Sequence, residues 1–416
     1  MACASSPALR AAEAGHFDGL RATLEAELAQ GRFGSGDATR FAHAVAAGEI
    51  ARASGEPGLQ RLHEVSSCAA ELSGPLGDRA DKHDAFGAAA ALVLLDEGVV
   101  SSGHFSRWAT LAADAPEAAW RGPGARSLGS RGDGELRRRL LADPDQEVRR
   151  NALLASLDAS DPADTEAVLE AARVDPFPAA RQQAIRAAGA IGGERVVIAL
   201  KDLWPRADAP AREAIVDAWA AERSFSAGGR RELEWVVSTQ HGLPAILAAS
   251  ALVHADGDRA VEAAGTLERA IKDGPTADRI RTLEKVPLTG ALREAVLKAE
   301  TDPDEAVAVA AMARVLKTPA EKAAREGIVA RLLPLAAGTG LAAAAARDAL
   351  AAAHEPQVLP ILERVAAADD AKARAEAGSA LAALGELGRA ALIALDREPS
   401  VRTTVACAIL RSAAHR

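Results

Sequence analysis

The chain has 416 residues, enough for two or three conventional domains or for one long array of repeats. Hydrophobic residues make up 49% and charged residues 26%, which excludes a disordered chain, whereas aromatic residues account for only 3%. Because aromatic rings supply much of the buried area in most globular cores, their scarcity favours closely packed helices built from small residues. The formal net charge of −9 argues against a nucleic-acid-binding protein, since phosphate binding needs clustered Lys and Arg.

The N-terminal residues support two competing predictions of location. The run Met1-Ala2-Cys3-Ala4-Ser5-Ser6-Pro7 resembles the cleavage junction of a bacterial lipoprotein, in which a small residue precedes the lipidated cysteine. On that interpretation Cys3 is lipidated and anchors the chain in the bacterial cell envelope. That location is the alternative; as the chain stands, the sequence favours a cytoplasmic protein with an incidental cysteine. No transmembrane segment is expected, because the best uncharged run, residues 85–95, falls short of the roughly 20 residues that a spanning helix needs.

Residues 1–118 are predicted to form an irregular helical cap that shields one open end of a repeat array. Helices are expected at residues 8–20 (two, around a Gly turn), 38–52, 58–72 and 81–95. Residues 119–142 form a junction or a degenerate repeat, in which Gly122-Pro123-Gly124 is expected to interrupt a helix. Cys3, Cys68 and Cys407 are too few and too scattered to indicate a disulfide framework or a zinc cluster.

From residue 143 onward one phrase recurs about nine times, at steps of 28 to 35 residues. It begins with an acidic or Pro-containing turn, followed by a small or branched apolar residue. The next residue is often Arg, and Ala follows three residues later. The clearest copies are Asp143-Pro144-Asp145-Gln146-Glu147-Val148-Arg149-Arg150-Asn151-Ala152 and Asp175-Pro176-Phe177-Pro178-Ala179-Ala180-Arg181-Gln182-Gln183-Ala184. Asp and Pro suit the start of a helix, so the phrase opens the second helix of each repeat.

Two columns of residues, four and eight positions after the start of each copy, define the buried face of these second helices. The mostly small column is Ala152, Ala184, Ile215, Ala248, Thr282, Ala311, Ala346, Ala377 and Val405. The mostly larger column is Ser156, Ala188, Trp219, Leu252, Val286, Val315, Leu350, Leu381 and Ile409. Other amphipathic stretches lie between the copies, as at residues 165–174, 194–204, 258–272 and 357–367, so each unit is a pair of antiparallel helices that needs its neighbours for stability.

The phrase, the helix pair and the period of about 32 residues resemble HEAT repeats, particularly the short HEAT-like type also seen in phycobilin lyases. The resemblance covers residues 143–416 and implies an all-α fold, a right-handed α-solenoid of stacked helix pairs. It also implies that the second helices line a concave surface. The positions off the core face are then candidates for binding a protein or peptide: Arg150, Gln182, Arg186, Glu213, Asp217, Glu284 and Asp348.

Other residues of chemical interest are interpreted as structural. Asp and Arg recur six residues apart in several copies, as in Asp143 and Arg149, which indicates a ladder that caps helices and links neighbouring turns. The densest set of metal-ligand types is Asp78, Asp81, His83 and Asp84, interpreted as the start of the helix that ends at residue 95. Arg137-Arg138-Arg139 is interpreted as a solvated helix face, and Trp219 as core.

The sequence therefore predicts a non-enzymatic scaffold or adaptor that binds a protein or peptide on its concave face. No catalytic residue, metal or cofactor is predicted. Two alternatives stay open: the same scaffold anchored in the cell envelope through Cys3, or a HEAT-like enzyme or lyase-type chaperone.

Overall fold

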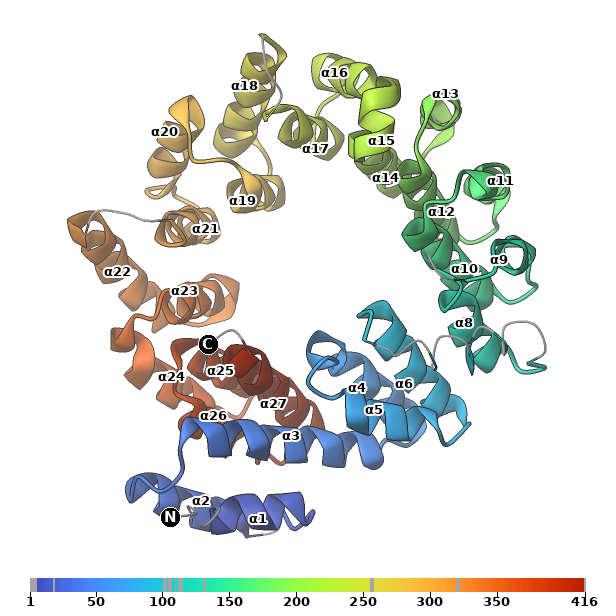
Figure 1. Cartoon of the computed structure of the whole chain (residues 1–416). Helices are drawn as coiled ribbons and strands as arrows, with labels where there is room; N and C mark the ends of the chain where they lie inside the picture. The colour runs from blue at the N-terminus through green and yellow to red at the C-terminus, as the bar shows by residue number, and fades with distance from the viewer. Residues whose placement is uncertain are drawn as a thin grey trace. The chain divides into compact units, whose positions relative to one another are not determined.

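A computed structural model describes residues 6–17, 19–99, 103, 107–108, 110, 115–129, 132–254, 258–318 and 322–414, and over these ranges it contains helices and no strands (Figure 1). The chain divides into two compact units. Unit 1 joins Met1–Val99 to Met312–Arg416, and unit 2 comprises Val100–Ala311. The three-part division drawn from the sequence stays a prediction, because these units group residues by contact and not by repeat.

The helices of unit 2 are α8 (Ala118–Arg126), α9 (Gly134–Leu140), α10 (Gln146–Ala159), η2 (Pro162–Asp164), α11 (Thr165–Val174), α12 (Pro178–Ile191), α13 (Glu194–Leu203), η3 (Trp204–Arg206), α14 (Ala209–Ala220), α15 (Glu222–Ser224), η4 (Phe225–Gly229), α16 (Arg230–Thr239), α17 (Leu243–Leu252), α18 (Asp258–Asp273), α19 (Thr276–Lys285) and α20 (Gly290–Ala299). Helix α21 (Glu305–Leu316) crosses the boundary between the units.

Unit 1 contains α1 (Pro7–Glu13), α2 (Leu20–Ala29), α3 (Ser35–Ala51), α4 (Gly55–Glu64), η1 (Ser66–Cys68), α5 (Ser73–Ala80) and α6 (Ala85–Asp96). Its C-terminal part contains α22 (Lys322–Ala336), α23 (Gly340–Ala352), η5 (Pro356–Val358), α24 (Leu359–Ala366), α25 (Ala371–Leu384), α26 (Leu387–Ile393) and α27 (Pro399–Ala414). The expected helix over residues 58–72 ends earlier, at Glu64, and gives way to η1. None of the described helices is both long and apolar enough to cross a membrane.

The fold is the predicted all-α solenoid of stacked helix pairs. In unit 2 the second helices α8, α10, α12, α14 and α17 pack side by side, and α11, α16 and α18 cover them from outside (Figure 1). Both predicted columns are buried in every copy, with no member more than 8% exposed. Spacings of four and eight thus identified the faces on which neighbouring helix pairs pack.

In several repeats, an arginine at the start of the second helix links the repeat to the one that follows. Nε and Nη2 of Arg149 donate to the carboxylate of Asp175 at 2.7 and 3.2 Å. Its Nη1 donates to the carbonyls of Asp143 and Pro144, in its own turn, at 2.9 and 3.2 Å. Burial alone would raise the pKa of the Asp175 carboxyl, but hydrogen bonds from Arg149 and the Phe177 amide hold it below its ordinary value.

The same arrangement recurs along the chain, and we call it the Arg–Asp ladder. Its pairs are Arg121–Asp143, Arg149–Asp175, Arg279–Asp302 and Arg374–Asp396. The predicted ladder therefore exists, but each arginine bonds the side chain of the acid in the following repeat and only the backbone of its own turn.

The prediction that Gly122-Pro123-Gly124 interrupts a helix is wrong. Helix α8 runs through these residues to Arg126, and all three are buried. A Cβ on Gly122 would lie 3.4 Å from Nδ2 of Asn151, so the glycine allows α8 to approach α10 closely.

In unit 1 the N-terminal helices cover the C-terminal end of the repeats. Helix α3 lies along α27 and also contacts α26 (Figure 1). Arg402 of α27 donates to the carbonyls of Asp396 and Arg397 at 2.8 and 3.0 Å, as a ladder arginine does. Its acidic partner is Glu49 of α3, at 2.8 Å. Glu49, only 1% exposed, thus replaces the Asp of a following repeat.

A disulfide between Cys68 of η1 and Cys407 of α27 joins the same two parts of the chain. Their Cα atoms lie 5.3 Å apart, although 339 residues separate them in sequence. Both cysteines are buried. The sequence-based view that the cysteines are too scattered to pair is therefore wrong for these two, because the N-terminal helices fold back onto the last repeat.

Glu49 provides a test of this closure. Glu49→Ala leaves Arg402 without its acidic partner and also removes an acceptor for Arg52 and Arg61. Breaking a buried ion pair on one side costs about 3–5 kcal/mol, so we expect α3 and α27 to lose hydrogen-exchange protection together. Glu147→Ala, which removes an exposed partner of Arg150, is the matched control and should cost less than about 0.5 kcal/mol. Equal protection in the two variants would contradict the assignment.

Candidate functional site

We call the surface of α12, α14, α17 and α19 that faces away from the covering helices α11, α16 and α18 the inner face of unit 2 (Figure 1). Arg281 of α19 lies 3.9 Å from Glu213 of α14, although α17 stands between these helices in the row. The two side chains thus approach each other across α17, and the surface that they flank is the candidate site.

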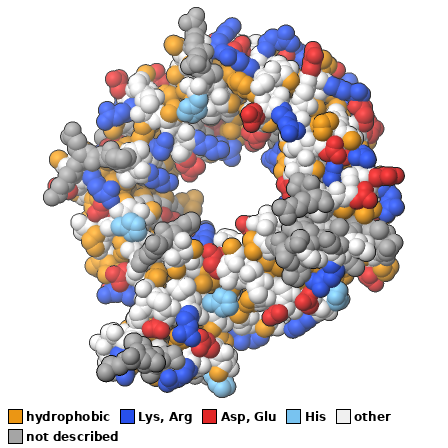
Figure 2. Space-filling view, in the orientation of Figure 1, with side chains coloured by type: hydrophobic (Ala, Val, Ile, Leu, Met, Phe, Trp, Pro, Cys, Tyr) orange, Lys and Arg blue, Asp and Glu red, His pale blue; other side chains and the backbone are white. Residues whose placement is uncertain are grey.

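Asp217 lies one turn after Glu213 on the same face. Desolvation by the surrounding helices raises the pKa of its carboxyl, although part of the residue reaches solvent. Attraction to Arg186 of α12 and Lys285 of α19 acts in the opposite direction. Charges of both signs, from three helices, therefore share this region, and Figure 2 shows acidic and basic side chains along this edge of unit 2.

Helix α17 forms an apolar strip between the charged helices. Its sequence, LPAILAASAL, carries no charged residue. Leu247, Ser250 and Ala251 are half-buried and share one helical face. Leu247 and Ala251 lie five and nine residues after the N-cap Gly242, as Glu213 and Asp217 do after the N-cap Asp208, which is one residue out of step with the columns counted from the repeat phrase. The site thus has an apolar floor with charged side chains on two sides.

The structure brings together most of the residues predicted from the sequence. Glu213, Asp217 and Arg186 lie on the inner face, with the half-buried Gln182 one turn before Arg186. Glu284 is exposed on α19. Whether any of them binds a partner stays a prediction.

The remaining candidates lie elsewhere. Arg150 is exposed on α10 and pairs at 3.2 Å with Glu147 of its own helix. Asp348 lies on α23 in unit 1 and is considered with that unit. Cys3 lies outside the described residues.

Sequence reasoning missed Arg281 and Lys285. Helix α19 buries Thr282, Leu283 and Val286, so its inner-facing positions include residues other than those given by the regular spacing. This copy keeps the ladder arginine, Arg279, but lacks a strong apolar pattern. Nothing in the repeat phrase indicated that these two basic side chains would lie near Glu213 and Asp217.

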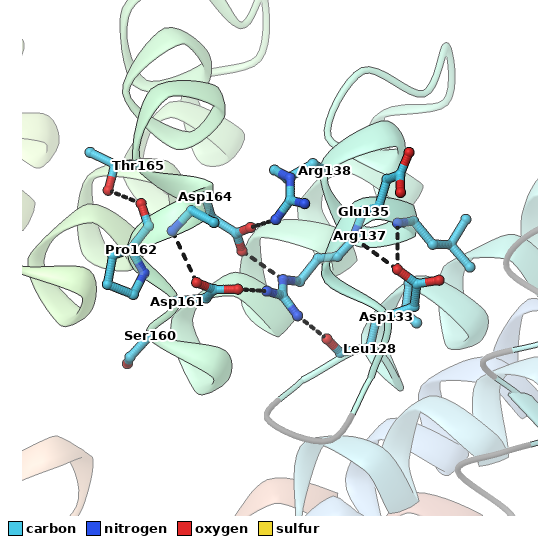
Figure 3. Close-up of polar contacts among 12 residues, drawn as sticks. Leu128, Asp133, Glu135, Arg137, Arg138, Ser160, Asp161, Pro162, Asp164 and Thr165 are labelled. Carbon is cyan, nitrogen blue, oxygen red and sulfur yellow. Dashed lines mark hydrogen bonds and ion pairs between the residues drawn. The ribbon is translucent and has the colours of Figure 1, made fainter.

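The predicted solvated face at Arg137-Arg138-Arg139 is wrong for its first member. Arg137 is 2% exposed, and its Nε donates to Asp164, which is fully buried, at 2.6 Å (Figure 3). Arg137 also donates to Asp161 at 3.2 Å and to the Leu128 carbonyl at 2.8 Å. A charge enclosed by protein acceptors has no room for a ligand, so this cluster joins α9 to η2 and α11.

Two other structural interpretations can be checked. Asp84 caps α6 by accepting from the Gly87 amide at 2.8 Å and pairs with Arg79, so it serves the helix start as predicted, whereas Asp81 ends α5. No group of three or more metal-ligand side chains converges within the described ranges. Trp219 is fully buried and stacks on Trp204 at 5.5 Å, as its core assignment predicted.

Asp348 and Glu376 place two carboxylates on neighbouring helices of unit 1, α23 and α25. Desolvation by the helices, together with repulsion from Glu376, raises the pKa of Asp348 to about 6, against the attraction of Arg347. An acid whose pKa is higher in the folded than in the unfolded state destabilises the fold as the pH rises through the folded value.

We therefore expect Asp348→Asn to raise the melting temperature at pH 7.5, with a gain of about 1 kcal/mol after allowance for solvent screening. The gain should shrink as the pH falls through about 6 toward 4, where the native carboxyl is already protonated. Thermal unfolding of wild type and variant across this range measures the effect. Parallel pH profiles of the two proteins would show that Asp348 does not titrate there.

Comparison with known proteins supports the fold assignment in part of unit 2. Residues 134–220, from α9 to the end of α14, match a family model described as HEAT repeats. A solved structure titled as an engineered protein is 18% identical and covers 85% of this chain and 96% of its own, with a TM-score of 0.31. A search of curated proteins found no match. The residues that match this family model include the ladder pair Arg149–Asp175.

Proposed function

We propose that the protein is a non-enzymatic scaffold or adaptor that binds a protein or peptide partner on the inner face of unit 2. HEAT repeats commonly serve as protein-interaction scaffolds, which supports the general class. The observation that carries the proposal is the convergence of Arg281 and Glu213 over α17. It creates a surface with charges of both signs around an apolar strip.

The composition of this surface favours a polypeptide over a polyanion. Basic residues Arg186, Arg281 and Lys285 alternate with acidic residues Glu213, Asp217 and Glu284. Nucleic acids require basic residues without nearby acidic competitors. A polypeptide can complement both signs with its own side chains and can place apolar groups on Leu247.

Site-specific photocrosslinking tests the proposal on whichever partner the cell provides. A benzoylphenylalanine at Leu247 should form adducts with a partner in the native cell, because it stands on the floor of the inner face. The matched control is the same group at Val261, which is 73% exposed on the outer helix α18. Arg281→Ala should reduce the Leu247 adduct about three- to tenfold, the effect of losing one charged contact. Equal adducts at both positions would refute binding on the inner face.

A second candidate keeps the scaffold and places it in the bacterial cell envelope. The disulfide Cys68–Cys407 supports it, because structural disulfides form and persist in oxidising compartments. On this proposal Cys3 carries the lipid anchor.

Mass spectrometry of the N-terminal peptide from natively expressed protein tests the envelope candidate. We expect a diacylated or triacylated Cys3 at the mature N-terminus. An unmodified peptide that retains Met1 or Ala2 would rule out lipidation and leave the cytoplasmic alternative.

A further inference from the structure

The Arg–Asp ladder is interrupted after Arg181. Like Arg149 and Arg374, Arg181 donates Nη1 to a carbonyl six residues earlier, that of Asp175, at 2.8 Å. The ladder acid stands two residues before the N-cap of the next second helix: Asp143 before Asp145, and Asp175 before Phe177. Helix α14 has Asp208 as its N-cap, so the equivalent position is occupied by Arg206. A basic residue thus replaces the expected acid.

Arg181 and Arg206 line a single pocket of about 410 Å³ between α11, α12, α13 and the start of α14, which we call the arginine pocket. Throughout the described ranges, no carboxylate lies within ion-pair distance of either guanidinium. Of the two acids that line the pocket, Asp208 accepts the Ala211 amide at 2.9 Å, and Asp202 is exposed on α13.

A third arginine and several apolar side chains complete the walls. Arg173 lines the pocket and has its nearest acid, Glu170, at 3.6 Å on its own helix. Val174, at the end of α11, is 64% exposed. Ile185 and Leu203 also line the pocket. This wall could contact the aliphatic part of an acidic side chain while the arginines bind its carboxylate.

The other end of the chain shows that the ladder accepts an acid from outside the following repeat. Arg402 bonds Glu49, 353 residues away in sequence, in the place of a repeat aspartate. A ladder arginine therefore needs a carboxylate at this position, and any segment that reaches the position can supply it. A guanidinium binds planar carboxylates through two parallel N–H donors.

We propose that the arginine pocket binds an Asp or Glu side chain of a polypeptide partner, in the place of the missing ladder acid. The inference takes its partner class from the proposed scaffold function, but the pocket lies between consecutive helix pairs and is separate from the floor formed by α17. Binding there would fix the position of a partner along the repeats, while the inner face contacts another part of it.

The probe for this site is a peptide that supplies the ladder acid elsewhere in this chain. Residues 174–178, Val-Asp-Pro-Phe-Pro, place an aspartate on Arg149 in the structure. The acetylated and amidated peptide, titrated into the full-length protein and followed by calorimetry, should bind in the wild type. Its Asp→Asn version should bind about tenfold more weakly, as should the Asp peptide to Arg206→Ala. The control Arg195→Ala, on α13 but paired with Glu166 outside the pocket, should bind like wild type.

Arg206→Asp makes the test independent of a folding defect. It puts an acid at the ladder position, so we expect it to raise the melting temperature and to abolish peptide binding. Equal binding of the Asp and Asn peptides, or an unchanged affinity in Arg206→Asp, would overturn the proposal. Inorganic phosphate is compared with acetate as a competitor at equal ionic strength, and a stronger effect of phosphate would overturn the assignment to a carboxylate. Leu247 crosslinks that persist in Arg206→Asp would separate failure here from failure of the scaffold function.

Discussion

Where the Arg–Asp ladder is present, a guanidinium at the start of the second helix is shared between its own turn and the acid of the next repeat, and this interaction joins neighbouring helix pairs. Arg149 binds two carbonyls on one side and Asp175 on the other, so a single side chain connects two helix pairs. Pairing offsets the cost of removing these charges from water. A helix pair without its neighbour would leave the arginine or the aspartate uncompensated, in addition to exposing its apolar columns. Hydrophobic packing and charge pairing therefore both require that such a repeat has a neighbour.

The last repeat has no successor to provide that acid. In this chain the N-terminal helices meet the requirement, because Glu49 receives Arg402 and α3 covers the apolar face of α27. The disulfide Cys68–Cys407 then joins the two segments covalently. By linking segments 339 residues apart, it restricts the unfolded chain most strongly where closure by contacts alone would be least probable.

Features that depend on regular spacing within a helix were predictable from the sequence, whereas contacts between distant segments were not. The columns from Ser156 to Ile409 were predictable, since the period of a packed helix face appears directly in the spacing of apolar residues. The partners of Cys68 and Glu49 were not, because they depend on the return of the chain and not on any local pattern. Arg137 was misjudged for a related reason: its charge is neutralised by Asp164, which lies 27 residues away in another helix pair. At the inner face, Glu213 and Asp217 followed the regular repeat, whereas the approach of Arg281 to Glu213 was not indicated by the spacing.

Two departures from the ladder are informative, because in each the arginine keeps its backbone contact but has no aspartate from a following repeat. At the chain end, the acid is absent from the repeat and another segment of the protein supplies it. At Arg206, the acid is absent, a second arginine has taken its place, and no described segment fills the position. An acid at this position would pair with Arg181, whereas a second guanidinium lining the same pocket adds repulsion, so selection for stability alone would favour the acid. Local costs of this kind are expected where a protein binds a ligand, because the unsatisfied groups of the free protein become the contacts of the complex.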